Sequence, residues 1–320
     1  MLLGFAVPTA GSWATPDNQV ELARRAEELG YASLWTFQRL LYPADPQRSP
    51  TPRRWRPVYR SVHDPLITLA YLAGVTSRVR LGVAVLNYPW YSPLLLAKMA
   101  TTLDAVSRGR LDLGLGLGWA QEEFAATATS PGRRGALAEE FLATLDAIWT
   151  QDVIQHEGEL GSFGDVRVEP KPTQRPRPPL LLGGSAEPAL RRAGRAADGW
   201  ISSSGQDLRT MGASIATVRA GAVEAGKDPS TLRFVCRGVV RVRRDGGSGS
   251  AAATDEPDRR PLSGEFDSIR ADLATLAEQG VTETFVDLNF DAEIGTVDAD
   301  PVESMRRAHE VLTELAPGTS

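Results

Sequence analysis

The amino-acid sequence predicts one (β/α)8 TIM barrel with insertion segments, on the basis of three observations. Short β-like apolar runs alternate with amphipathic helical stretches eight times, which is the pattern of βα units and a parallel sheet. A chain of 320 residues, 42% of them hydrophobic, has the length and the core for one such barrel. No linker with a change of composition divides the chain near its middle. We therefore expect one domain over 1–320, with an open α/β sheet as the alternative.

The first half of the chain is expected to supply four strands and the helices between them. The strands are expected at 2–7, 32–35, 79–86 and 111–117, with a helix at 93–106 before the last. An earlier helix should begin at Asp17 as its N-cap and stop at Gly30, and Asp64 with Pro65 should begin another. The segment 36–63 is crowded with proline and arginine and too polar for a core element, so we interpret it as an active-site loop.

The second half continues the alternation after one interruption. A helix at 133–150 precedes an insertion at 151–170, where repeated glycines indicate a β-hairpin or a bulged excursion. The remaining strands are expected at 180–182, 199–202, 234–242 and 284–288, and the remaining helices from Ser185, through 208–218, and at 266–279 and 302–315. The segment 245–261 is rich in glycine, serine, alanine and charge, and we predict that it is mobile.

Composition excludes several classes of function. The 35 basic and 40 acidic residues give a net charge of −5, so no global positive field exists to hold a nucleic acid. The single cysteine, Cys236, excludes an intramolecular disulfide and a cysteine-based zinc site, and it fits a reducing compartment. Residues 1–15 lack a basic start and a long apolar run, so we expect neither a signal peptide nor a membrane span. These features predict a cytoplasmic protein with no membrane partner.

Lysine and histidine are scarce. Their positions are Lys98, Lys171, Lys227, His63, His156 and His309. General bases and metal ligands are therefore few, so we expect no metal site. We expect a bound cofactor to supply any difficult chemistry.

Two glycine-rich segments follow expected strands. Gly183 and Gly184 would let the backbone approach a ligand, and the free N–H groups of the helix that follows would attract a phosphate. A tight turn capped by Ser185 is the alternative. The other segment carries Gly116 and Gly118, but no third glycine stands where a dinucleotide fingerprint needs one. These glycines could serve barrel packing, or let a flat ring lie against the strand end.

Aromatic and polar side chains close two neighbouring strands. The third expected strand closes on Asn87, Tyr88, Trp90 and Tyr91. The second closes on Trp35, Phe37, Gln38 and Arg39. The aromatic rings could line a pocket for a planar ligand, or merely cover an edge of the sheet. Arg39 suits an anionic group, with an ordinary surface arginine as the alternative.

Several separate motifs, in the right order, carry a family resemblance. They are EELGYASLW at 27–35, TSRVRLG at 76–82, LDAVSRGR at 103–110, GGS at 183–185 and ADGW at 197–200. Together they resemble the luciferase-like monooxygenase superfamily, and more narrowly its branch that uses the deazaflavin coenzyme F420. The match covers about the first two hundred residues and continues weakly to the end.

The resemblance implies a TIM barrel, usually a homodimer, that binds a flavin or deazaflavin at the C-terminal mouth. It also implies a non-proline cis peptide at Ala84-Val85. Ring and phosphate contacts are expected from Trp35, Ala84, Val85, Asn87, Gly116, Gly118, Trp119, Gly183, Gly184 and Ser185. A substrate pocket is expected from Phe37, Trp90 and Tyr91.

One departure from the family pattern bears on the chemistry. Many deazaflavin members read Asp-His after the second strand, where this chain reads Gln38-Arg39. That histidine often serves as the acid/base partner, and no histidine of this chain stands at a matching position. We therefore expect reduction of a polarised C=C or C=N bond rather than alcohol oxidation by that route. The proton would come from water bound to Gln38, from Tyr88 or from solvent.

The sequence thus predicts a coenzyme F420-dependent oxidoreductase that acts on a small organic substrate, with Gln38, Arg39 and Tyr88 as catalytic residues. A two-component monooxygenase that uses reduced FMN is the alternative on the same fold. A third possibility, from another class, is a non-catalytic flavin-binding or deazaflavin-binding barrel. Substrate choice would rest chiefly on the loop 36–63.

Overall fold

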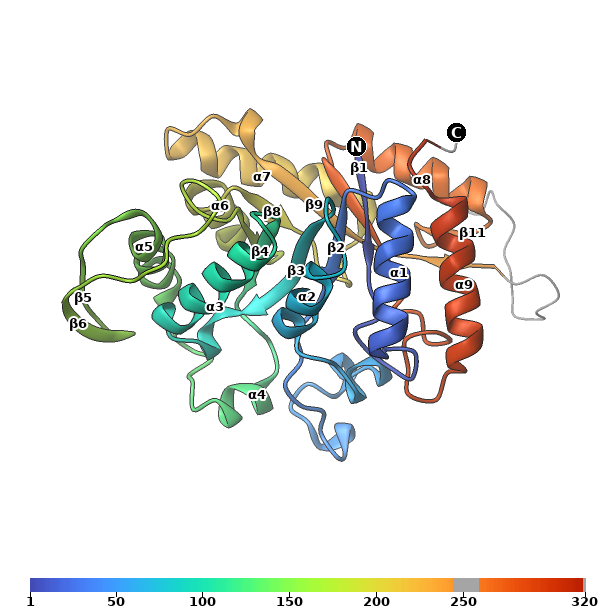
Figure 1. Cartoon of the computed structure of the whole chain (residues 1–320), viewed down its shortest axis with the longest axis horizontal. Coiled ribbons are helices and arrows are strands. Elements are labelled where there is room, and N and C mark those ends of the chain that lie inside the picture. Colours follow the sequence, from blue (N-terminus) through green and yellow to red (C-terminus); the bar gives the residue numbers. More distant parts are fainter. Residues whose placement is uncertain (244–258, 319–320) are drawn as a thin grey trace.

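Eight parallel strands close into a barrel in this computed structural model, which describes residues 1–243 and 259–318 (Figure 1). In pairing order around the barrel they are β1 (Leu2–Ala6), β12 (Glu283–Asp287), β9 (Arg233–Val239), β8 (Gly199–Ile201), β7 (Leu180–Gly183), β4 (Leu111–Gly116), β3 (Arg80–Asn87) and β2 (Ser33–Thr36). The barrel closes where β1 pairs with β12, with Leu2 opposite Glu283. The predicted barrel is confirmed, and the open sheet is excluded.

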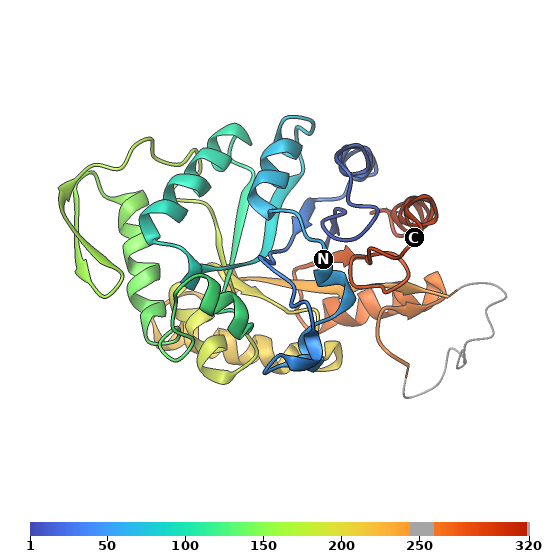
Figure 2. The same ribbon diagram turned by 90° about the horizontal axis from the view of Figure 1, so that it is seen from below.

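Helices surround the barrel. They are α1 (Pro16–Glu28), α2 (Pro65–Ala73), α3 (Pro93–Val106), α4 (Gln121–Ala126), α5 (Leu137–Thr150), α6 (Glu187–Ala196), α7 (Met211–Glu224), α8 (Phe266–Glu278) and α9 (Pro301–Glu314). The Asp64 carboxylate caps α2 by accepting the Ile67 N–H, as predicted. The predicted Asp17 cap of α1 is wrong. Thr15 accepts the Asn18 N–H instead, because Pro16 already suits the first helical position. Figure 2 shows α1 and α9 end-on, side by side.

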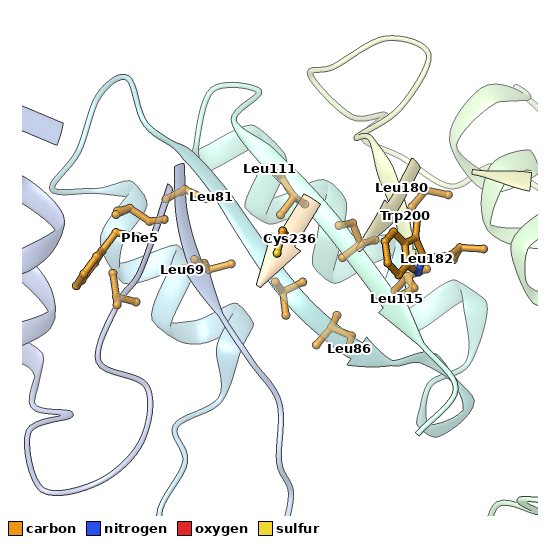
Figure 3. Close-up of a cluster of buried hydrophobic side chains, with 14 of the residues drawn as sticks. Phe5, Leu69, Leu81, Leu86, Leu111, Leu115, Leu180, Leu182, Trp200 and Cys236 are labelled. Atoms are coloured by element: carbon orange, nitrogen blue, oxygen red, sulfur yellow. The ribbon is translucent and has the colours of Figure 1, made fainter. Parts of the chain in front are cut away.

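The main core lies between the strands and the helices. Leucines on the outer face of the barrel, among them Leu81, Leu111 and Leu180, pack in one cluster with Leu69 of α2 (Figure 3). Each is fully or almost fully buried. Burying such a side chain contributes about 1.5–3 kcal/mol, so this layer is the principal source of stability.

Inside the barrel, inward-facing side chains form layers. The apolar middle layer consists of Ala6, Trp35, Ala84, Leu181, Ile201, Val235 and Phe285. Trp35 stacks on Phe285 with ring centroids 5.0 Å apart. A Cβ atom at Gly82 would lie 2.4 Å from the Trp35 ring, so glycine makes room for the indole. Trp35 therefore fills the middle of the barrel.

A charged layer closes the N-terminal end of the barrel. Arg233 lies 2.7 Å from Asp112 and 3.0 Å from Glu283, and Arg80 lies 2.6 Å from Asp112. Neither carboxylate is more than 3% exposed, and the guanidinium groups hold the pKa of Asp112 below its usual range despite burial. Ser33 donates a further hydrogen bond to Glu283 at 2.5 Å. This layer is a polar floor beneath the apolar one.

Three segments depart from the simple alternation. The loop 36–63 contains short 3-10 turns at Pro46–Arg48, Pro52–Arg54 and Pro57–Arg60. It also buries Trp55 and Val58, so it contributes more to the core than its polarity predicts. The insertion forms the predicted hairpin from β5 (Ile154–Gly158) and β6 (Gly161–Val166), which stands apart from the barrel in Figure 1.

The predicted strand 234–242 is two strands. Its first part is β9 of the barrel, and its end, β10 (Arg241–Val242), pairs with β11 (Ser263–Gly264) in a separate small sheet. Most of the segment predicted to be mobile, 245–258, lies outside the described residues. Its described end is held to α8, because Arg259 forms an ion pair of 2.6 Å with Asp272.

Candidate active site

Gln38 joins the ends of β2 and β3. Its side-chain oxygen accepts the Asn87 backbone N–H at 2.8 Å, and its Nε2 donates to the Tyr91 hydroxyl at 2.5 Å. Gln38 and Asn87 are buried, and Tyr91 is half-buried. The carboxyl ends of parallel barrel strands meet at one face. The proximity of these residues could therefore be predicted from the sequence.

The structure places the two candidate tyrosines differently. Burial raises the pKa of Tyr91, with the Gln38 hydrogen bond opposing the rise. The Tyr88 ring instead packs on Phe141 of α5, with centroids 4.7 Å apart, and its hydroxyl donates to the Arg134 carbonyl at 3.4 Å. Burial raises the pKa of Tyr88 as well. The Tyr91 hydroxyl is therefore hydrogen-bonded to Gln38, whereas the Tyr88 hydroxyl is bonded elsewhere.

Arg39 is paired within the protein. Its Nη1 lies 2.5 Å from Glu123 of α4, and the two side chains are 8% and 0% exposed. The guanidinium carbon also lies 4.7 Å from the Trp119 ring centroid and 5.1 Å from that of Tyr59. Burial raises the pKa of Glu123, and the Arg39 charge opposes this. Arg39 thus has an internal counter-charge where the sequence led us to expect a substrate anion.

Val85 fills the space that three glycines leave. The Ala84-Val85 peptide is cis, as the resemblance implies. A Cβ at Gly116 would lie 2.5 Å from one Val85 methyl, and a Cβ at Gly183 would lie 3.4 Å from the other. At Gly114 it would lie 2.1 Å from the Val83 carbonyl oxygen. The glycines of β4 therefore have a packing role, which is compatible with a ligand lying above Val85.

Asn87 lies beside the turn that follows β4. A Cβ at Gly118 would lie 3.4 Å from the Asn87 side-chain oxygen, and the Gly118 φ of +72° is one that glycine adopts readily. Trp119 follows directly and packs on Trp55 of the loop, with centroids 4.9 Å apart. The expected ring contacts Val85, Asn87 and Gly116–Trp119 are therefore gathered at one side of the mouth.

The segment 183–186 leads into α6 without a side-chain cap. Gly184 has a φ of +128°, and a Cβ there would lie 2.7 Å from Cβ of Ala189. Ser185 is not the N-cap, because Ala186 holds that position and offers no side-chain hydrogen bond. Gly184, Ser185 and Ala186 are exposed, and among the described residues no hydrogen-bond acceptor faces the Ser185 or Ala186 N–H. This helix start can accept an anion.

Phe37 and Trp90 pack against different aromatic partners at the mouth. Phe37 is buried against Phe290, with centroids 5.2 Å apart. Trp90 lies 6.2 Å from Phe124 of α4, and its indole N–H is buried with no partner among the described residues. Trp35 lies in the apolar layer below and is fully buried. Of the expected substrate pocket residues, Phe37 thus contacts Phe290, Trp90 contacts Phe124 and Tyr91 contacts Gln38.

A buried ion pair that the sequence did not single out lies one layer above Trp35. Arg237 Nε is 3.4 Å from Asp287 Oδ2, and the side chains are 7% and 1% exposed. Arg237 Nη2 also donates to the carbonyl oxygen of Ala84. Burial lowers the pKa of Arg237 and raises that of Asp287. The signal that could have revealed the pair is two-residue alternation, since Val235 faces the barrel interior two positions before Arg237.

Two further observations concern metal-binding groups and long apolar helices. Over 1–243 and 259–318, no group of three or more histidine, cysteine, aspartate or glutamate side chains is placed to hold a metal ion. Within the same ranges, no helix has the length and apolar character needed to cross a membrane.

Sequence comparison identifies the family. The family model for luciferase-like monooxygenases matches residues 2–282. An uncharacterized protein of Mycobacterium tuberculosis is 39% identical over 45% of this chain and 51% of its own length. An FMNH2-dependent dimethylsulfone monooxygenase of Pseudomonas putida is 34% identical over 50% and 45%. An F420-dependent glucose-6-phosphate dehydrogenase of Kineococcus radiotolerans is 30% identical over 60% and 54%. The matches thus span about half the length of these relatives.

Solved structures share the fold. A monooxygenase from Streptomyces bottropensis superposes with a TM-score of 0.77 at 23% identity, over all of both chains. A coenzyme F420-dependent tetrahydromethanopterin reductase from Methanopyrus kandleri superposes with a TM-score of 0.72 at 16% identity, over 100% of this chain and 99% of that one. At these identities the likeness concerns the barrel alone.

Proposed function

Because the chain belongs to the luciferase-like monooxygenase family, we propose that it is a coenzyme F420-dependent oxidoreductase acting on a small organic substrate. The observation that carries the proposal is the uncapped start of α6 beside Gly183 and Gly184, on the same barrel face as Val85 and Gln38. Relatives that use F420 and relatives that use FMNH2 both match this chain, so the choice of deazaflavin is the finer part of the proposal.

The residues present fit such a cofactor. The backbone of Gly183, Gly184 and Ser185 would hold the phosphate, because the two glycines carry no side chain and the N–H groups at a helix start attract anions. Val85, Asn87 and the turn 116–119 would hold the ring. When bound, the deazaflavin would supply the hydride exchange, which the few titratable side chains of this chain could not supply.

Gln38 and Tyr91 are the proposed polar pair of the site. Because Gln38 Nε2 donates to the Tyr91 oxygen, the phenolic hydrogen of Tyr91 is left to donate elsewhere. Burial raises the pKa of Tyr91, so it keeps that hydrogen at neutral pH. We propose that Tyr91, and not Tyr88, donates to the substrate atom that gains a proton when a C=C or C=N bond is reduced. Arg39 then acts through Glu123, by holding the loop 36–63 in place.

The test of this function is titration of the purified protein with coenzyme F420, followed by the coenzyme fluorescence. We expect saturation at micromolar to tens of micromolar concentrations, the order of magnitude of a cofactor site. No change in the coenzyme fluorescence at those concentrations would contradict the deazaflavin proposal.

The alternative, a two-component monooxygenase that uses reduced FMN, keeps the same phosphate and ring contacts. It predicts oxygen consumption with FMNH2 beyond the free-flavin background when substrates are supplied. A non-catalytic binding barrel predicts that bound reduced coenzyme is never oxidised by any substrate. A single-turnover oxidation of the bound reduced coenzyme by a substrate would exclude the non-catalytic barrel.

A homodimer in the cytoplasm completes the proposal. The neighbouring helices α2 and α3 expose Ile67, Tyr71, Leu94 and Leu95, which are between 40% and 68% exposed. Exposed apolar side chains gathered on packed helices are typical of a surface that another subunit covers. These side chains support the proposed dimer, and we propose them as part of its interface.

A further inference from the structure

A strongly basic pocket lies beside the proposed active site. Its volume is about 360 Å³, within the range of small-molecule sites. Its charged lining consists of Arg56, Arg209, Arg237, Arg241, Arg260 and Asp207. This concentration of one charge contrasts with the overall charge of −5.

The pocket adjoins the proposed cofactor site through the barrel. Its walls come from the loop after β8 and from β9 and β10, and β8 pairs with β7, which ends at Gly183. Arg237 reaches from the pocket to the carbonyl oxygen of Ala84, beside Val85. A ligand in the pocket would therefore lie next to the floor on which the coenzyme ring is proposed to rest.

The arginines have few internal counter-charges. Arg237 faces Asp287 at 3.4 Å, and Arg209 lies 3.9 Å from Asp207. The Arg241 side chain donates to the Phe290 carbonyl at 3.3 Å, and the carboxylate of Asp291 is close enough to act on its pKa.

The other two arginines are still less compensated. Arg56 contacts the Phe290 ring at 5.8 Å, and the Arg260 side chain has no partner within the described part of the chain. Burial, together with the charges of Arg260 and Arg56, lowers the pKa of Arg241. Five cations thus face three carboxylates, and an anion would relieve their repulsion.

We propose that this pocket binds a phosphate-type dianionic group on the organic substrate. The guanidinium fork matches the oxygens of phosphate in pairs, and the excess of cations suits two negative charges better than one. This inference rests on the proposed function, because it names the substrate class of the same site. The mouth would then have two regions, a redox region over Val85 and an anchoring region lined by arginine.

The experiment uses phenylphosphonate as the probe and benzyl alcohol as its uncharged counterpart, with binding to the full chain measured by calorimetry. Phenylphosphonate should bind, with an affinity that falls as salt is added. Benzyl alcohol should not bind. Arg241→Gln and Arg260→Gln should each weaken phenylphosphonate binding by about 10-fold or more, the size expected for a lost charged hydrogen bond. Arg306→Gln is the matched control, since Arg306 is exposed on α9 and pairs with Glu303.

No binding to the unchanged protein, or equal binding to the Arg241, Arg260 and control variants, would overturn the proposal. A second arm repeats the titration with saturating F420 or FMN. Unchanged affinity supports a substrate site, whereas competition would assign the pocket to the coenzyme phosphate and overturn the proposal. If neither coenzyme binds while phenylphosphonate still does, the proposed coenzyme function fails and the anion pocket stands.

Discussion

Glu123 holds Arg39 at 2.5 Å in a buried ion pair that ties the loop 36–63 to α4. Its other oxygen accepts the Leu40 N–H at 2.7 Å, so one carboxylate fixes both the side chain and the backbone of the loop. Figure 1 shows this loop and α4 at the same end of the barrel. One acidic residue therefore fixes the start of the loop at the mouth.

Glu123→Gln should lower the free energy of unfolding by about 3–5 kcal/mol, because it leaves the Arg39 guanidinium buried without a counter-charge. Urea denaturation measures this loss. The double variant Arg39→Met, Glu123→Leu should recover much of it, since an apolar pair carries no uncompensated charge. A loss below about 1 kcal/mol in Glu123→Gln would match a solvated surface pair and contradict the prediction.

Tyr91→Phe should reduce turnover by about 10-fold to 100-fold while coenzyme binding is kept, because it removes the hydroxyl beside Gln38. Tyr88→Phe should change turnover less than Tyr91→Phe, since the Tyr88 hydroxyl donates to the Arg134 carbonyl and not to a group of the proposed site. Steady-state kinetics on both variants makes the comparison. A larger loss in Tyr88→Phe would restore Tyr88 as the donor.

Gly183→Val should raise the coenzyme dissociation constant by more than about 10-fold. A Cβ at Gly183 would lie 3.4 Å from a Val85 methyl, so the added methyls of valine would crowd the space between Val85 and the proposed phosphate site. Gly164→Val is the control, because a Cβ at Gly164 on β6 meets nothing within 4 Å. Fluorescence titration measures the affinity for the coenzyme, and thermal unfolding checks that both variants are folded. Equal affinity in the two variants would refute the assignment of the phosphate site.

The thiol of Cys236 should be inert in the native protein. Cys236 is fully buried in the cluster of Figure 3, and burial raises its pKa to about 12. A thiol reagent at pH 8 should react only after unfolding. Above about pH 8.5 the unfolded chain loses the thiol proton while the folded chain keeps it, so the free energy of unfolding should fall as the pH rises from 8.5 to 10. This part of the fall should be missing in Cys236→Ala.

Leu95→Glu should convert a dimer into monomers, because it places a charge among the exposed apolar side chains of α2 and α3. Light scattering after size exclusion gives the mass. Val302→Glu is the control, since Val302 is exposed on α9. A monomeric parent protein, or a dimer that persists in Leu95→Glu, would remove α2 and α3 as the interface.

The barrel was predictable because its signals are local. Alternating strands and helices, and caps such as Asp64 with Pro65, need only neighbouring residues to be recognised. The start of α1 was misplaced because Thr15 and Asp17 are both good caps, and the proline between them decides which one is used. The division of 234–242 into β9 and β10 depends on pairing with a distant segment, which no local pattern contains.

The site was predictable only where strand ends meet. Gln38 and Tyr91 close adjacent strands, so the barrel alone brings them near one another. Glu123 could not be foreseen as the partner of Arg39, because 84 positions separate them and α4 begins without a signal. Arg237 was missed although its alternation with Val235 places it on the inner face of β9, because its partner Asp287 lies on the distant strand β12 and no local pattern joins the two.

The polar floor of the barrel has a consequence for folding. Asp112 comes from the first half of the chain, whereas Arg233 and Glu283 come from the second. The first half also supplies Ser33, whose hydroxyl donates to Glu283. Each half keeps one ion pair of its own, Arg80 with Asp112 and Arg233 with Glu283, whereas the bonds from Arg233 to Asp112 and from Ser33 to Glu283 join the two halves. Fragments cut between β4 and β7 lose these joining bonds, so each should be less stable alone than when the two are mixed. The polar side chains at this closed end therefore couple the folding of the two halves.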